Sequence, residues 1–288
     1  SSSIQFLVLG FCMGSCTGFG VPVAKYFGAE KIEKMRDYIF NGAVLCAGIA
    51  VILTALCSVL CPQILHILSV PEDIYDNAYS YLLIIFLGIP FTILYNYLSS
   101  ILRSVGDSRT PFIFLALSAV LNIFLDLYMV ATLHLGVAGA AYATFIAQGI
   151  SAVCSFLIFL HTLRRLDGKA ETWFSKAEFS SMSRIALPSI LQQSTVSIGM
   201  MLVQSVVNGF GTQILAGFSA GMRIESLCVV PMSAIGNALS SYAAQNIGAE
   251  KHERIPLGYR AANIMVAITA VILCLFLELL HRPLIALF

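Results

Sequence analysis

Charged side chains are scarce in this sequence of 288 residues. Lys and Arg number 16 and Asp and Glu 15, so 11% of the chain is charged, while 58% is hydrophobic and the mean hydropathy is +0.88. Soluble domains carry about 25% charged residues, so the composition excludes an ordinary soluble enzyme. The basic residues form no stripe, which excludes a nucleic-acid surface. The composition predicts an all-α polytopic membrane protein.

Catalytic and metal-binding motifs are also missing. The chain has no CxxC pair and no HExxH sequence, and its eight cysteines lie in or beside apolar runs, as small buried hydrophobes do. The only acid deep within an apolar run is Asp126, whereas intramembrane hydrolysis needs paired acids or a Ser/His arrangement. We therefore expect no enzyme and no cofactor.

Apolar runs long enough to cross a bilayer, at about 20 residues each, recur along the chain. Basic residues gather in alternate connecting segments, which hold 14 of the 16 Lys and Arg. The positive-inside rule places these four segments in the cytoplasm and predicts a multi-pass protein of the cell membrane. The predicted cytoplasmic segments are 25–37, 102–110, 162–184 and 249–260, and the eight predicted spans are 4–24, 38–68, 77–101, 111–133, 136–161, 185–207, 214–246 and 259–281.

An internal repeat divides the chain. Residues 26–31 read YFGAEK and residues 246–251 read NIGAEK, an offset of 220 residues that contains six predicted spans. An even number of spans gives both copies the same orientation, as in parallel transporter repeats. We predict an N-terminal lobe at 1–162, a cytoplasmic linker at 163–184 and the start of a C-terminal lobe at 185–288. By this arithmetic the first lobe lacks its opening helix and the second its last three, so we expect a fragment of a protein with about twelve spans.

Asp126 is the one charge in the apolar run 111–133, and Asn122 precedes it by one helical turn. A carboxylate at the centre of a spanning helix costs roughly 2.5 to 3.5 kcal/mol, so a partner, a proton or a cation must compensate it. Carboxylate and amide oxygens suit a proton or a small hard cation. A structural Asp held by a neighbouring helix is the alternative.

Several segments together resemble the multidrug and toxic compound extrusion (MATE) family. They are GAEK after a Gly-rich span, ILRSVGDSRTP leading into LNIFLDL, GVAGAAYATFIAQ, and ALPSILQQ at the start of the second lobe. The resemblance implies two six-helix lobes around a central cavity. It also implies export of organic cations or other amphiphiles in exchange for H⁺ or Na⁺, by rocking of the lobes.

In one branch of that family the ion site lies in the first lobe, and the matching residues here are Asn122, Asp126 and Thr144. The opening-helix Asp of that branch has no counterpart in this chain. The Glu of the other branch is absent from residues 185–207, which favours first-lobe coupling. The depths of Asp126 and Thr144 below the outer ends of their spans also agree. Asp126 is seven residues before Leu133 and Thr144 is eight after Gly136, which places them about 10 and 12 Å deep at 1.5 Å per residue.

Other polar residues are weaker candidates. Tyr81 suits either the ion site or an interfacial aromatic belt, and Gln148 follows Thr144 by one turn. Gln192, Gln193 and Ser197 suit either a substrate cavity or hydrogen bonds between helices.

We expect a monomer that binds small amphiphilic or cationic substrates in the lipid bilayer. A lipid-linked precursor flippase of the same superfamily is the alternative. Such a flippase would need several basic residues in its cavity to hold a pyrophosphate, and the first-lobe spans carry no interior Lys or Arg.

Overall fold

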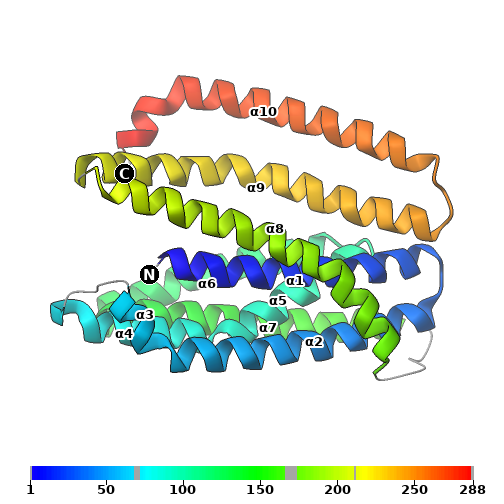
Figure 1. Cartoon of the computed structure of the whole chain (residues 1–288), viewed down its shortest axis with the longest axis horizontal. Helices are drawn as coiled ribbons and strands as arrows, with labels where there is room; N and C mark the ends of the chain where they lie inside the picture. Colours follow the sequence, from blue (N-terminus) through cyan, green and yellow to red (C-terminus); the bar gives the residue numbers. More distant parts are fainter. Residues whose placement is uncertain (1, 68–71, 166–173, 211, 287–288) are drawn as a thin grey trace.

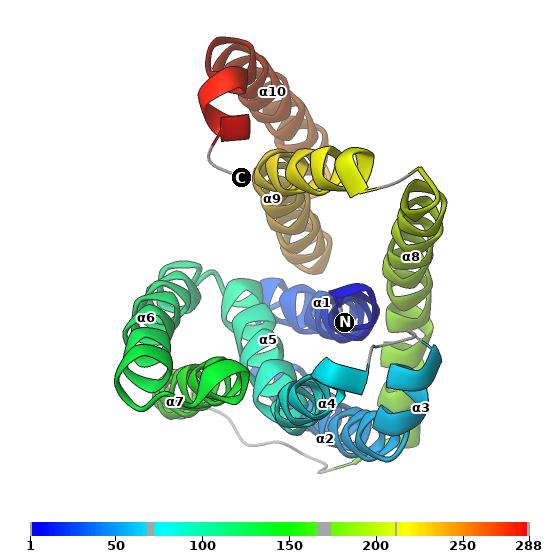
Figure 2. The same cartoon turned by 90° about the vertical axis from the view of Figure 1, so that its left-hand side faces the viewer.

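The computed structural model describes residues 2–67, 72–165, 174–210 and 212–286, and this part of the chain is helical without any strand (Figure 1). Helix α1 lies at the centre, with α8 and α9 against it on one side and the rest of the first lobe on the other (Figure 2). The elements are α1 (Ser2–Gly28), α2 (Ile32–Val59), α3 (Cys61–Ile67), α4 (Glu72–Leu87), α5 (Ile89–Ser104), α6 (Arg109–Asp126), the π-helix η1 (Leu127–Thr132), α7 (Gly136–Arg165), α8 (Lys176–Asn208), α9 (Thr212–Gly248) and α10 (Arg254–Ala286).

Seven of the eight predicted spans are confirmed as helices long and apolar enough to cross a membrane. The eighth, 4–24, lies within α1, whose only charge is Lys25 in its last turn. Two predicted spans are interrupted. The span 38–68 is divided at Leu60 into α2 and α3, and the span 77–101 bends at Gly88 between α4 and α5. A proline follows each break by two residues and has no N–H to continue the preceding helix.

The helices extend further into the basic segments than the apolar pattern predicts. Helix α7 continues to Arg165 and α8 begins at Lys176, so the described part of the predicted linker 163–184 is mainly helical. Residues 166–173 lie outside the described residues. The other basic connections shorten to residues 29–31, 105–108 and 249–253. Charged side chains at a helix end reach water, so they need not end the helix.

The start of α8 is fixed to α2 by buried polar groups. Asn41 donates its amide to Glu178 Oε2 at 3.0 Å and accepts a hydrogen bond from the backbone N–H of Ser175 at 3.0 Å. Lys34 Nζ lies 3.8 Å from Glu178 Oε1. This cluster, inside a segment predicted to be a hydrophilic joint, attaches the second lobe to the first. The residue bounds of the two lobes stay a prediction.

The buried core lies mainly between α1, α2, α4 and α5, and side chains of α7 and α8 complete it. Its fully buried members include Phe19, Met35, Leu82, Phe86 and Leu98. By contrast, α6 and α10 expose large apolar side chains over most of their length. The five cysteines of α1, α2 and α3 are buried and unpaired, as small hydrophobes are expected to be.

Helices α1 and α8 pack closely through a line of glycines. Gly10, Gly14 and Gly18 repeat every four residues and so share one face of α1. A Cβ atom at Gly18 would lie 2.6 Å from the Cα atom of Ala186, and one at Gly14 would lie 2.9 Å from the Ser189 carbonyl oxygen. Small residues allow this approach of two backbones inside a membrane.

Replacing Gly18 by Ala is expected to destabilise the bundle by about 1–3 kcal/mol, because the added methyl group overlaps backbone atoms that cannot rotate away. Thermal unfolding of the purified protein in detergent measures the effect. Gly48→Ala on α2 is the matched control, since a Cβ there has no atom within 4 Å. Equal melting temperatures for the two variants would contradict the packing argument.

The GAEK repeat is confirmed as one structure formed twice. Glu30 and Glu250 both adopt positive φ values, 56° and 58°. Around them the same hydrogen bonds recur at the offset of 220 residues: Ala29, Glu30 and Lys31 donate to Lys25, Phe27 and Tyr26, and Ala249, Glu250 and Lys251 donate to Gln245, Ile247 and Asn246. Each turn ends a helix by satisfying its last carbonyl groups.

The two GAEK turns contact each other reciprocally at one end of the bundle, the right-hand end in Figure 1. A Cβ at Gly28 would overlap the carbonyl of Gln245, and a Cβ at Gly248 would overlap the carbonyl of Lys25. Because Gln245 and Gly248 are the repeat partners of Lys25 and Gly28, this is the contact of a local two-fold axis. It brings three of the predicted cytoplasmic connections to one end, because Gln245 Nε2 also donates to the Ser104 carbonyl at 2.8 Å.

Candidate functional site

Asp126 lies where α6 changes into the π-helix η1. It is the last residue of α6 and the N-cap of η1, and the wider hydrogen bonding is seen in the bond from Leu133 N–H to the Tyr128 carbonyl, 3.0 Å, five residues back. Single π turns within helices are rare and occur frequently at functional sites. The sequence signalled the carboxylate but not this change of helix type.

Asn122 and Thr144 meet, whereas the depth comparison was made for Asp126 and Thr144. The Asn122 amide Nδ2 donates to Thr144 Oγ1 at 3.3 Å, and this bond joins α6 to α7. The Thr144 hydroxyl donates in turn to the Ala140 carbonyl of its own helix at 3.1 Å. The bond between Asn122 and Thr144 uses the nitrogen of the Asn122 amide, and the amide oxygen Oδ1 takes no part in it.

Asp126 follows one turn after Asn122, and its side chain is partly buried. Its oxygen Oδ1 is inaccessible to solvent and has no hydrogen-bond partner. A buried acceptor without a donor is costly, and a proton or a cation would remove that cost. The arrangement therefore offers three kinds of hard oxygen (carboxylate, amide and hydroxyl) on two adjacent helices, which suits H⁺ or Na⁺. The role of these residues as an ion site stays a prediction.

Gln148 lies one turn beyond Thr144 on α7 and accepts a hydrogen bond from Thr92 Oγ1 on α5 at 2.7 Å. Thr92 begins the second turn after the bend at Gly88. Gln148 therefore joins α7 to the start of α5, one helical turn along α7 from Thr144. The sequence analysis selected Gln148 but missed Thr92. Nothing in the sequence around Thr92 indicates a functional role.

The remaining predicted residues lie elsewhere. Tyr81 is half-buried and packs against the apolar core of the first lobe. Ser197 is buried and its Oγ donates to the Gln193 carbonyl of its own helix at 3.1 Å. Both Ser197 and Gln193 face α1 at Gly10, which favours a packing role for this side of α8. Gln192 is exposed, and a cavity role for it stays a prediction.

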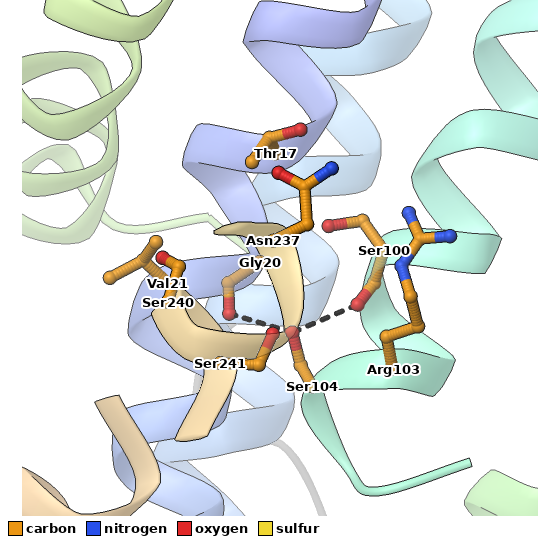
Figure 3. A pocket seen from close by; sticks show the side chains of 9 residues that line it. All are labelled: Thr17, Gly20, Val21, Ser100, Arg103, Ser104, Asn237, Ser240 and Ser241. Carbon is orange, nitrogen blue, oxygen red and sulfur yellow. Dashed lines mark hydrogen bonds between the residues drawn. The ribbon is translucent and has the colours of Figure 1, made fainter. Parts of the chain in front are cut away.

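A small polar cavity lies between α1, α5 and α9, that is, between the two lobes (Figure 3). It has a volume of about 10 Å³ and is lined by Thr17, Gly20, Val21, Ser100, Arg103, Ser104, Asn237, Ser240 and Ser241. Ser104 Oγ closes one wall by donating to the carbonyls of Gly20, at 2.9 Å, and Ser100, at 2.8 Å.

Arg103 is the charged residue of this cavity. The sequence pattern placed it in a cytoplasmic connection, but it belongs to the last turn of α5. Its guanidinium extends back along the helix to the level of Ser100 (Figure 3). Long side chains on a helix point toward its N-terminus, so an arginine at the end of a span reaches into it. Arg103 thus lies beyond the predicted span 77–101, at the end of α5, and its side chain lines the cavity.

Comparison with known proteins identifies the family. The MatE family matches residues 1–128 and 188–288. "Probable multidrug resistance protein YpnP" of Bacillus subtilis is 34% identical over 257 residues, which cover 88% of this chain and 57% of that protein. The "FAD transporter" of Shewanella oneidensis is 22% identical and is matched over 99% of this chain and 64% of its own length. The chain thus spans about three fifths of the length of these relatives.

The fold agrees with a solved structure. A structure described as "Outward-facing conformation of a multidrug resistance MATE family transporter of the MOP superfamily" superposes with a TM-score of 0.88 over 99% of this chain and 64% of the other, at 23% identity. The apolar spans, the parallel repeat and the family match agree. This chain is a multi-pass cell-membrane protein and belongs to the MatE family.

Proposed function

We propose that the protein is a secondary active exporter that moves amphiphilic organic cations out of the cell in exchange for H⁺ or Na⁺. The observation that carries the proposal is the buried, unpartnered Oδ1 of Asp126 beside the Asn122–Thr144 pair, within a family of transporters. Supporting it, the names of several relatives refer to multidrug resistance.

The proposed coupling is an exchange of charge at the first lobe. Ionised Asp126 makes the membrane interior attractive to a cationic substrate, because a carboxylate there has little solvation. Entry of H⁺ or Na⁺ from outside neutralises the carboxylate and weakens the attraction, so the substrate leaves outward. Coupling requires the ion and the substrate to prefer different states of the protein.

The two states of the exchange would differ in which side of the membrane the cavity opens to. The GAEK turns meet at the end of the bundle that the charge pattern assigns to the cytoplasm, so we take this structure as the form closed to the cytoplasm. The flippase alternative is less favoured, since Arg103 is the single basic residue lining the cavity between the lobes.

Efflux of a fluorescent organic cation from vesicles that contain the full-length protein tests this function. We expect efflux driven by either an inward proton gradient or an inward sodium gradient. The gradient that supports efflux identifies the ion, because protonation and sodium binding both neutralise the same carboxylate. Vesicles without the protein are the control. Absence of efflux under both gradients would contradict the proposal.

A further inference from the structure

Arg103 has no acidic partner. None of the nine residues that line the polar cavity is acidic, and in the part of the chain that the structure describes no carboxylate pairs with the guanidinium. Arg103 lies in the last turn of its span, where a basic side chain can reach water without a fixed partner in the protein. The side chain remains exposed to the space beside the cavity, so a partner from outside the protein can reach it.

Hydrogen-bonding side chains line the cavity together with Arg103. Thr17 and Ser100 contribute hydroxyl groups from the first lobe, and Asn237 and Ser240 contribute an amide and a hydroxyl from the second. Figure 3 shows the Ser100 side chain between Asn237 and the Arg103 guanidinium. Guanidinium with several neutral donors is the chemistry that recognises phosphate and carboxylate groups.

The size of the cavity limits what enters it. A volume of about 10 Å³ holds about one water molecule, and therefore one oxygen atom of a larger group. Asn237 and Ser240 belong to α9 and line the cavity from the side of the second lobe. An oxyanion can place one oxygen inside while the rest of its molecule lies between the lobes.

We propose that Arg103 and the polar cavity between α1, α5 and α9 bind the anionic group, a phosphate or carboxylate, of an amphiphilic substrate. This inference rests on the proposed export function and extends its substrate class to molecules with an acidic group. Both lobes contribute donors, so movement of α9 away from α1 takes the site apart. Binding of the anion is therefore tied to the arrangement of the lobes.

Equilibrium binding of flavin mononucleotide and riboflavin, which differ by one phosphate, tests the proposal on the full-length protein in phosphatidylcholine nanodiscs. We expect the phosphorylated molecule to bind about tenfold more tightly, from one charge-assisted contact. Arg103→Gln should abolish this preference, and Arg103→Lys should retain part of it. Arg109→Gln, an exposed arginine of the next helix, is the matched control and should retain all of it.

Equal binding of the two flavins, or a preference that survives Arg103→Gln, would overturn the proposal. Loss of the preference in phosphatidylglycerol nanodiscs would assign the site to a lipid headgroup, and displacement by inorganic phosphate at equal affinity would assign it to free phosphate. Each of these results overturns the substrate assignment. A site that holds water only would give equal binding. The assay needs no ion gradient, so failed efflux of a cationic dye would overturn the export proposal without affecting this result.

Discussion

Asp126→Asn is expected to reduce ion-driven efflux to the level of vesicles without protein. Asparagine has nearly the same shape as aspartate, but it binds no proton near neutral pH and carries no negative charge to balance Na⁺. The Oδ1 atom that has no partner in this structure would become part of a neutral amide. Insertion and folding should persist, because removal of a charge from a spanning segment lowers the cost of insertion. Efflux of the fluorescent cation under the gradient that drives the wild type measures the effect.

Asp76→Asn is the matched control for this substitution. Asp76 is exposed near the start of α4, and the chemical change is the same. Its efflux should equal that of the wild type. Normal efflux in Asp126→Asn would remove Asp126 from the coupling site and leave it as a structural residue. Equal loss in both variants would show that the effect follows from total charge and not from position.

Gly248→Ala is expected to prevent the two GAEK turns from meeting and so to favour the form open to the cytoplasm. The added Cβ would overlap the carbonyl of Lys25, which belongs to the backbone of α1 and cannot rotate aside. Separation of the lobes at this end is the only way to relieve the overlap without unfolding a turn. A cysteine placed at Ser241 in a cysteine-free background reports the opening. In inside-out vesicles its reaction with an impermeant maleimide should accelerate about tenfold, as expected when a population shifts by about 1.4 kcal/mol.

Gly221→Ala controls for the effect of a methyl group on α9, because a Cβ at Gly221 has no atom within 4 Å. Its reaction rate should match that of the parent. Gly28→Ala should repeat the effect of Gly248→Ala, since the contact is reciprocal. An unchanged maleimide rate in both variants, with normal folding, would show that this contact does not control access from the cytoplasm.

Periodicity and composition predicted the helices well because a bilayer imposes a length and an apolar character on every span. The positions where helices break were less visible. Gly88 bends the α4–α5 span and Leu60 ends α2, and in both places a proline two residues later decides the break. The π turn after Asp126 left no mark in the sequence, since it depends on how the end of α6 packs against α7.

The helical spacing of Asn122 and Asp126 could be seen in the sequence, and the similar depths of Asp126 and Thr144 indicated that α6 and α7 could bring polar groups together. The contact in the structure joins Asn122 to Thr144, and the ion site itself stays a prediction. Ser197 and Gln193 lie against α1 at Gly10, a neighbour that the spacing of polar residues on one face could not identify, and their role in a substrate cavity stays a prediction. Thr92 joined the site only through its contact with Gln148.

The sequence by itself determined the membrane class, the order of the spans, the repeat of 220 residues and the acid at position 126. These follow from local properties: apolar length, the distribution of charge and the identity of single residues. Only the tertiary structure decided that the two GAEK turns touch, that Asp126 Oδ1 has no partner and that Arg103 lies at a cavity shared by both lobes. Each of these depends on the distance between segments far apart in the chain, which packing sets and no local pattern records.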